Sequence, residues 1–559
     1  MPSKITHITS NINDDLDTCV FDIKISDNLL QTLTPTIESI VSNKIASRIK
    51  AKDYTIWGKD AEEESKKRLG WVDAASKAEN FIKDLYEYKK LLSERGLSRV
   101  VLAGMGGSSL APEVICNVYQ KDIVILDSTN PEQVQNTLVD LEKTVLVVSS
   151  KSGSTVETDS ALHTFEQAFN AKNLDSSKHI VIVTDPMSPF EQYANEKGYK
   201  VFHGDIQVGG RFSALTAFGL LPSYLAGVNV ESIVNDADKT SELVYRDFDA
   251  NPAIILGAAL SASVLKQGSS SADKTLLVDT ASGLANFADW AEQLIAESSG
   301  KIGKSILPIV CSEPTELAYN LHDVLPVYIS GTQECAFTDR VNQHIEVTGS
   351  LGAQFLVWEV ATAIACYVIG VNPFDQPNVE SAKVASREIL ANMDKATDSN
   401  SYDIVQLQAF NLGTPNISSE NFEDVDSVLH SLFSNVKDDS YLAVMIYGDR
   451  ISYSDSVSTL RQELVNKLKR PVTIGWGPRF LHSTGQLHKG GAKNGVFLQI
   501  QIDSTTALEV VGKDFTYNDL VTAQAVGDFK VLADLKLPVV RIKCKNDKVF
   551  KDLCNLITN

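Results

Sequence analysis

The sequence predicts an α/β protein with two domains, each a parallel sheet that helices cover on both faces. Short apolar runs of strand length alternate with helical patterns in two successive blocks of the chain. Strands buried on both faces are near-continuous apolar runs, and helices connect them when they are parallel. Turns rich in glycine or hydroxyl residues follow several of these runs, as expected where a strand passes into a helix.

The chain is too long for one ordinary core, because its 559 residues suggest several units at roughly 150 residues per domain. Residues 78–93 have apolar side chains at helical spacing, so we expect a helical N-terminal segment. Residues 394–439 are rich in Asn, Ser and Asp, which indicates an acidic insertion with one helix near 425–433. The predicted units are the N-terminal segment 1–95, a first domain 96–245, the first part of a second domain 246–393, the insertion 394–439, and the C-terminal part of the second domain 440–559.

The two blocks supply the strand candidates in chain order. Those of the first sheet are 100–103, 123–126, 145–148, 179–183 and 200–202. Those of the second sheet are 275–278, 306–310, 324–329, 442–447, 472–475, 496–502 and 539–542. The repeated alternation is compatible with a duplicated fold.

Composition excludes several classes of function. The net charge of −20 repels nucleic acid and anionic lipid, so we expect neither as a partner. The chain shows no signal peptide and no stretch of about 20 apolar residues, which argues against a membrane span. Seven scattered cysteines form no C-x-x-C pair, so we expect no zinc site and a reducing, cytoplasmic location.

The turn after the apolar run 145–148 is the best candidate for an anion site. Five hydroxyl residues, one glycine and one lysine lie in 149–155, before an expected helix. Unpaired N–H groups at a helix start attract anions, and hydroxyl groups add donors. No G-x-x-x-x-G-K-[ST] pattern is present, so a phosphorylated metabolite is favoured over a nucleotide. The alternative is a helix N-cap rich in serine and threonine.

Two glycine-containing turns are weaker candidates. The run G-M-G-G-S-S at 104–109 follows the first strand and would let a ligand approach the backbone, although a tight turn explains it equally well. The run V-G-G-R-F-S at 208–213 places Arg211 on a turn, where a guanidinium can neutralise an oxyanion. Its alternative is a surface turn with a structural ion pair.

Three further segments carry chemistry-bearing side chains. Gln293 and Glu297 are four residues apart and share a helix face, so Glu297 is a candidate base or else an exposed carboxylate. The segment 373–383 places Gln376 and Lys383 where both can enter a cleft, or it is an ordinary helix–turn–helix. The run 477–491 holds two histidines, of which His482 is a candidate acid or base and otherwise a structural residue.

Taken together, these segments resemble phosphoglucose isomerases over most of residues 95–545. Three sequence patterns of that family occur in the chain. Residues 208–213 match V-G-G-R-[FY]-S, residues 374–383 match F-[DN]-Q-x-x-V-E-x-x-K, and residues 150–158 match S-K-S-x-S-T-x-E-T. The resemblance looks closest to the isomerase portion of transaldolase–phosphoglucose isomerase fusions. It implies two sugar-isomerase (SIS) domains, no cofactor and no metal. It also implies interconversion of glucose 6-phosphate and fructose 6-phosphate, and a possible homodimer.

The resemblance implies roles for individual residues. It assigns the base that moves a proton between C2 and C1 to Glu297, and stabilisation of the enediolate to Arg211. It assigns ring opening to His482 and Lys383, with Glu157 orienting the histidine. The residues expected to hold the substrate are Gly107, Ser108, Ser150, Lys151, Ser152, Thr155, Gln293 and Gln376.

The sequence departs from the family pattern at two places. The histidine segment follows the F-D-Q segment instead of preceding it, so His322, which lies in the usual window, is the alternative to His482. Asn378 stands where the family usually has glycine, and asparagine tolerates a left-handed backbone. Two other functions stay open, a non-catalytic phosphosugar-binding regulator and an isomerase of amino-sugar phosphates.

Overall fold

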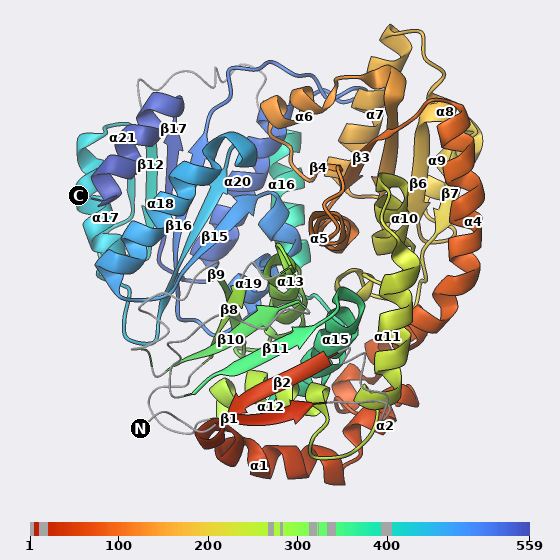
Figure 1. The fold of residues 1–559 in the computed structure, drawn as a ribbon. Helices are drawn as coiled ribbons and strands as arrows, with labels where there is room; N and C mark the ends of the chain where they lie inside the picture. The colour runs from red at the N-terminus through yellow and green to blue at the C-terminus, as the bar shows by residue number, and fades with distance from the viewer. Residues whose placement is uncertain are drawn as a thin grey trace.

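The computed structural model describes residues 5–9, 21–265, 273–279, 283–311, 321, 323–331, 343–392 and 405–558. These residues form three sheets with helices packed around them (Figure 1). The first sheet lies at the upper right of Figure 1, the second at the bottom and the third at the left. Helix α13 (Phe287–Ser299) lies in the centre, between the three sheets.

The first sheet is fully parallel, with strand order β4-β3-β5-β6-β7. Alternate side chains of its strands enter two separate apolar cores, one on each face, as a doubly covered parallel sheet requires. Its strands are β3 (Arg99–Gly104), β4 (Val124–Leu126), β5 (Thr144–Ser149), β6 (Ile180–Thr184) and β7 (Lys200–His203). Its helices are α4 (Ala74–Glu94), α5 (Leu110–Val118), α6 (Pro131–Thr137), α7 (Val156–Ala171), α8 (Ser176–His179), α9 (Pro189–Lys197) and α10 (Ala217–Ala226).

The second sheet has the order β1-β2-β11-β10-β8-β9, with β1 and β2 antiparallel to their neighbours. The N-terminal segment, predicted to be helical, therefore also supplies two strands to this sheet. The strands are β1 (Ile5–Thr9), β2 (Phe21–Ser26), β8 (Lys274–Asp279), β9 (Leu307–Cys311), β10 (Val324–Ser330) and β11 (Ile345–Gly349). The helices are α1 (Asp27–Ser42), α2 (Ile45–Lys50), α3 (Glu62–Ser65), α11 (Val230–Val244), α12 (Pro252–Leu265), α13 and α15 (Leu351–Ile369).

The third sheet differs from the expected division of the chain. Residues 440–559, predicted to complete the second sheet, form a sheet of their own with the order β13-β12-β17-β16-β14-β15, and the expected insertion supplies two of its strands. The strands are β12 (Val405–Phe410), β13 (Ile417–Ser419), β14 (Tyr441–Tyr447), β15 (Val472–Gly477), β16 (Gly495–Ile502) and β17 (Val539–Cys544). The helices are α16 (Val379–Asn392), α17 (Glu423–Phe433), α18 (Arg450–Leu468), α19 (Gly485–Gly490), α20 (Tyr517–Asp534) and α21 (Asp547–Thr558).

The three sheets share one strand order. Numbered along the chain, the first four parallel strands of each sheet lie side by side in the order 2-1-3-4. The second and third sheets also share an apolar core, in which Tyr328 of β10 packs with Tyr441 and Met445 of β14. The third sheet is therefore a further copy of the same topology, built onto the second.

Helix α15 corrects the expectation that no long apolar stretch exists. By length and composition its 19 residues could cross a membrane, but 89% of the apolar window is buried inside the protein. Its side chains enter the main apolar core together with those of α11 and α12. Within the described residues α15 is thus a core helix of the second sheet.

Candidate active site

Two turns at the carboxyl end of the first sheet form the floor of the site. The G-M-G-G turn follows β3 and the hydroxyl turn follows β5, and these adjacent strands lie where the strand order reverses. Ligands of open α/β sheets bind in the crevice at this position. Gly107, Ser108, Ser150, Lys151, Ser152 and Thr155 all line one pocket of about 660 Å³ there.

The hydroxyl turn is folded back on itself above the start of α7. The hydroxyl groups of Ser150 and Thr155 are 3.1 Å apart, and the N–H of Gly153 donates to Ser150 Oγ at 3.2 Å. Thr155 makes no side-chain capping bond to α7, so its hydroxyl is not used as an N-cap. This arrangement favours an anion cradle over the alternative of a plain helix cap.

The Lys151 ammonium already has partners within the protein. It forms an ion pair with Asp185 and donates to the carbonyl oxygen of Asp205 at 3.3 Å. Burial lowers its pKa, and the two aspartates oppose that effect. Arg68, which lines the same pocket from the N-terminal segment, is a cation that the sequence reasoning missed.

Close backbone packing joins the G-M-G-G turn to the arginine turn. A Cβ atom on Gly107 would lie 2.1 Å from the carbonyl oxygen of Gly210, so only glycine fits there. This contact brings Arg211, in the 3₁₀ turn Gly210–Phe212, beneath the pocket. Glycine here is required by the close approach of two backbones.

Arg211 and Glu297 form a buried pair next to the pocket. Their side chains are 1% and 4% exposed, and Arg211 Nη1 donates to Glu297 Oε2 at 3.2 Å. Arg211 Nε donates to Ser298 Oγ at 2.9 Å, so one guanidinium holds two successive residues at the end of α13. Glu297 lines the pocket, whereas Arg211 lies behind it.

The environment of Glu297 raises the pKa of its carboxyl, which is the direction that favours a general base. Burial raises the pKa of its carboxyl above the ordinary value. The charge and hydrogen bond of Arg211 offset part of this rise, and the His482 charge contributes in the same direction. A base is most effective when its pKa lies near the working pH.

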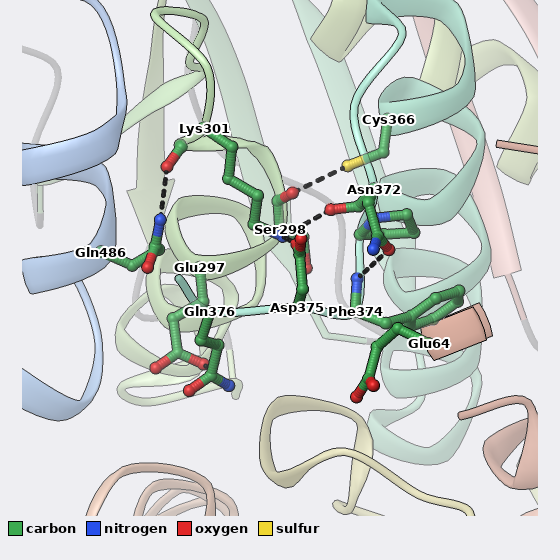
Figure 2. A network of polar contacts seen from close by, with 12 residues as sticks. Glu64, Glu297, Ser298, Lys301, Cys366, Asn372, Phe374, Asp375, Gln376 and Gln486 are labelled. Atoms are coloured by element: carbon green, nitrogen blue, oxygen red, sulfur yellow. Dashed lines mark hydrogen bonds and ion pairs between the residues drawn. The ribbon is translucent and has the colours of Figure 1, made fainter. Parts of the chain in front are cut away.

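The turn that carries Gln376 is fixed by two cations, Arg211 and Lys301. Arg211 Nη2 donates to the carbonyl oxygens of Pro373 and Asp375, while Lys301 donates to the carbonyl oxygen of Asn372. Lys301 also forms an ion pair with Asp375 at 2.9 Å, and burial lowers its pKa to about 8. Gln376 Nε2 thereby reaches Glu297 Oε2 at 3.4 Å, and Figure 2 shows the two side chains next to each other.

His482 reaches the opposite side of the pocket from the third sheet. It ends the 3₁₀ turn Arg479–His482 after β15, and its Nε2 lies 3.1 Å from Glu157 Oε1. Burial acts to raise the pKa of Glu157, but the charge and hydrogen bond of His482 hold it below the ordinary value. Gln293 Nε2 donates to the His482 carbonyl oxygen at 2.8 Å, which ties the histidine turn to α13.

Lys383 is the one predicted site residue that stands apart. It projects from α16 with its side chain 45% exposed, lies 3.9 Å from Glu380, and does not line the pocket. Its charge still acts on Glu157. His322, the alternative to His482, lies outside the described residues.

Asn378 has a different role from the one expected. Its backbone is not left-handed, so the tolerance of asparagine for that conformation is not used. Instead, Asn378 Oδ1 accepts from Gln486 Nε2 and its N–H donates to Gln486 Oε1, each at 2.9 Å. Gln486 also donates to the carbonyl oxygen of Gly300 at 2.9 Å. The histidine segment is therefore fastened to both the Glu297 and the Gln376 segments.

Some residues at the site belong to none of the sequence motifs, and the sequence did not predict them. Gln524 of α20 donates to Glu157 at 2.8 Å, and Glu64 lines the pocket. Their neighbours in sequence carry no pattern that marks them. Only the folding of distant segments brings them to the site.

Comparisons with known proteins relate the chain to one family. Residues 73–309 match the family model described as phosphoglucose isomerase. A probable glucose-6-phosphate isomerase of Methanococcus maripaludis is 26% identical over 389 residues, which is 59% of this chain and 86% of that protein. The glucose-6-phosphate isomerase of Campylobacter jejuni is 25% identical over 53% of this chain and 86% of its own length.

Solved structures share the fold. A hypothetical protein from Thermus thermophilus matches with a TM-score of 0.57 and 22% identity, over 66% of this chain and all of that one. A glucose-6-phosphate isomerase from Chlamydia trachomatis matches with a TM-score of 0.53 and 19% identity, over 69% of this chain and 91% of that one. At these identities the likeness concerns the fold alone.

Proposed function

We propose that this chain, a relative of the phosphoglucose isomerases, interconverts glucose 6-phosphate and fructose 6-phosphate. The observation that carries the proposal is the buried carboxylate of Glu297, held by Arg211 at the edge of a pocket whose floor is a hydroxyl cradle. The cradle would bind the phosphate through hydroxyl and backbone N–H groups. The sugar would then extend toward Glu297 and His482.

The pair of His482 and Glu157 supports a ring-opening step. We propose that the imidazole moves a proton between O1 and the ring oxygen, while Glu157 fixes its orientation and balances its charge. The 3.1 Å contact joins the two side chains within one chain. We place Lys383 in a supporting electrostatic role, because its charge reaches Glu157 although its side chain does not line the pocket.

Proton transfer would follow on the open-chain sugar. Glu297 takes the proton from C2 of the aldose, which leaves a cis-enediolate with its charge on O1. The hydroxyl proton of O2 then moves to O1, and the same carboxyl returns its proton to C1. Electrostatic stabilisation of such an intermediate supplies a large share of the rate in many enzymes. Since Arg211 lies behind Glu297, we propose that it acts mainly by positioning this carboxylate and setting its pKa.

A non-catalytic sugar-phosphate regulator needs the cradle but has no use for a buried carboxylate. The desolvation of Glu297 is costly without a chemical role. The geometry thus favours the enzyme. We further propose that it works in the cytoplasm, in keeping with the free thiols of the five described cysteines.

The test compares the wild type with Glu297→Gln in a coupled assay on fructose 6-phosphate. We expect the substitution to lower kcat by roughly 10²- to 10⁴-fold, the usual share of general acid–base catalysis, with substrate binding altered only a few-fold. Glu388→Gln, which changes an exposed carboxylate of α16, is the matched control and should behave as the wild type. Normal turnover by Glu297→Gln would refute the assignment of the base, and an inactive wild type would refute the function.

A further inference from the structure

Helix α20 of the third sheet places one amide against the carboxylate that orients the histidine. Gln524 is buried, and its Nε2 donates to Glu157 Oε1 at 2.8 Å. The same oxygen lies 3.1 Å from His482 Nε2. One carboxylate oxygen therefore binds both the histidine and the amide, and both donors come from the third sheet and its connections.

The orientation of the Gln524 amide is determined by its two partners. An ionised carboxylate only accepts hydrogen bonds, so the NH₂ end of the amide must face Glu157. The carbonyl end, Gln524 Oε1, accepts from the hydroxyl of Thr129 at 2.7 Å. The backbone of Gln524 is held in addition, because the Tyr447 hydroxyl donates to its carbonyl oxygen at 3.4 Å.

We propose that Gln524 is a positioning residue that, with Thr129, fixes the Glu157 carboxylate so that Oε1 faces His482. The proposal rests on the function proposed above, in which this pair opens the sugar ring. Without the amide, the carboxylate loses the donor that fixes its rotamer, and the imidazole is no longer held toward the ring oxygen. Misplacement of a catalytic group by about 1 Å can cost about 10²-fold in rate.

Substitution of Gln524 separates this role from simple packing. Gln524→Leu should lower kcat by roughly 10- to 100-fold with little change in KM. Gln499→Leu is the matched control: Gln499 is fully buried on β16 and donates to the backbone of Ala525 on α20, at 3.0 Å, without touching Glu157. It should lose stability in the same way as Gln524→Leu but keep its kcat. Equal losses of kcat in the two variants would overturn the proposal.

Gln524→Glu supplies a readout that packing alone does not produce. A glutamate here repels Glu157 when ionised, but its protonated form donates an O–H in place of the amide N–H. The other charged or titratable groups that act on Glu157 are His482, Lys383 and Tyr447, and the substitution leaves them in place. We expect the ratio of variant to wild-type kcat to rise as the pH falls from 8 to 5, and the ratio for Gln524→Leu to stay flat. A flat ratio for Gln524→Glu would overturn the proposal.

A measurement without substrate keeps the positioning role separate from the proposed function. NMR of selectively labelled histidine follows the His482 ring, whose signals should change in Gln524→Leu and stay near wild type in Gln499→Leu. Unchanged His482 signals in Gln524→Leu would refute the positioning role even if the wild type is active. Should Gln524→Leu not fold, Thr129→Val removes only the hydroxyl that orients the amide and should give a smaller change of the same kind.

Discussion

At the scale of single residues, the pairing of Glu297 with Arg211 determines what this site can do. Burial raises the pKa of the carboxyl, whereas the adjacent guanidinium favours the charged form and offsets part of that rise. The net effect is a pKa above the ordinary value. Because a base works only when ionised, the activity should fall as the pH drops through a value above the ordinary glutamate pKa of about 4.3.

Arg211→Met should shift the loss of activity at low pH to a higher pH. The substitution removes the charge and the hydrogen bond that lower the pKa of Glu297, so a larger fraction of the base is protonated at a given pH. The measurement is the pH profile of kcat/KM. Lys301→Met is the control, since it loosens the same turn at Asn372 without removing the partner of Glu297. In this variant kcat/KM should fall at the same pH as in the wild type. If kcat/KM of Arg211→Met falls at the same pH as in the wild type, the role given to the arginine is contradicted.

At the scale of elements, helix α15 shows how an apolar core helix can carry one carboxyl group. Glu359 is buried within it, and neither of its carboxyl oxygens has a hydrogen-bond partner among the described residues. Burial raises the pKa of Glu359 well above the ordinary value. Helix α15 therefore contributes to a stability that depends on pH.

Glu359→Gln should remove this dependence. A group with a raised pKa in the folded state contributes full stability below its unfolded pKa, and the contribution is lost as the pH rises toward the folded value. The free energy of unfolding of the variant, relative to that of the wild type, should therefore rise with pH. The rise is about 1.4 kcal/mol for each pH unit above pH 5, as long as Glu359 of the folded wild type stays protonated. Urea unfolding at pH 5 and pH 7 measures the difference. A constant difference between the two pH values would show that Glu359 is ionised in the folded protein.

At the scale of the whole molecule, the third sheet closes the site by docking on the first. Arg450 and Arg479 form ion pairs with Glu113 of α5 at the contact between them, and their charges lower the pKa of Glu113 to about 2 despite its burial. Tyr517 adds a buried contact to Thr164 of α7 at 2.9 Å. These contacts hold the His482 turn over the pocket, so one chain supplies both halves of the site.

A mixture of two inactive variants tests whether a single chain is sufficient. Because His482 and Glu157 meet within one chain, Glu297→Gln and His482→Ala should not complement each other, even when they are co-expressed. The coupled assay on the mixture should give the sum of the separate activities. A clear gain over that sum would mean that the histidine enters the site of a partner chain.

The sequence by itself determined the parts whose signal is local. Apolar runs of strand length predicted every strand of the first sheet and the parallel strands of the third to within about two residues, because buried strands need continuous apolar side chains. The hydroxyl turn, Glu297 and Gln376 lie within short motifs, and these residues do line one pocket. In the second sheet β11 was missed, since Ile345–Gly349 contains Glu346 and Thr348 and lacks a continuous apolar run.

Only the tertiary structure decided how the chain divides and what surrounds the reacting groups. The antiparallel strands β2 and β12 are defined by pairing with β11 and β17, which lie far away in the sequence, and the second of these pairings turned an expected insertion into part of a third sheet. The same long-range contacts buried Arg211 behind Glu297, left Lys383 outside the pocket and brought Gln524 to Glu157. Such contacts depend on which surfaces meet after folding, and the residues next to each group in the sequence do not encode them.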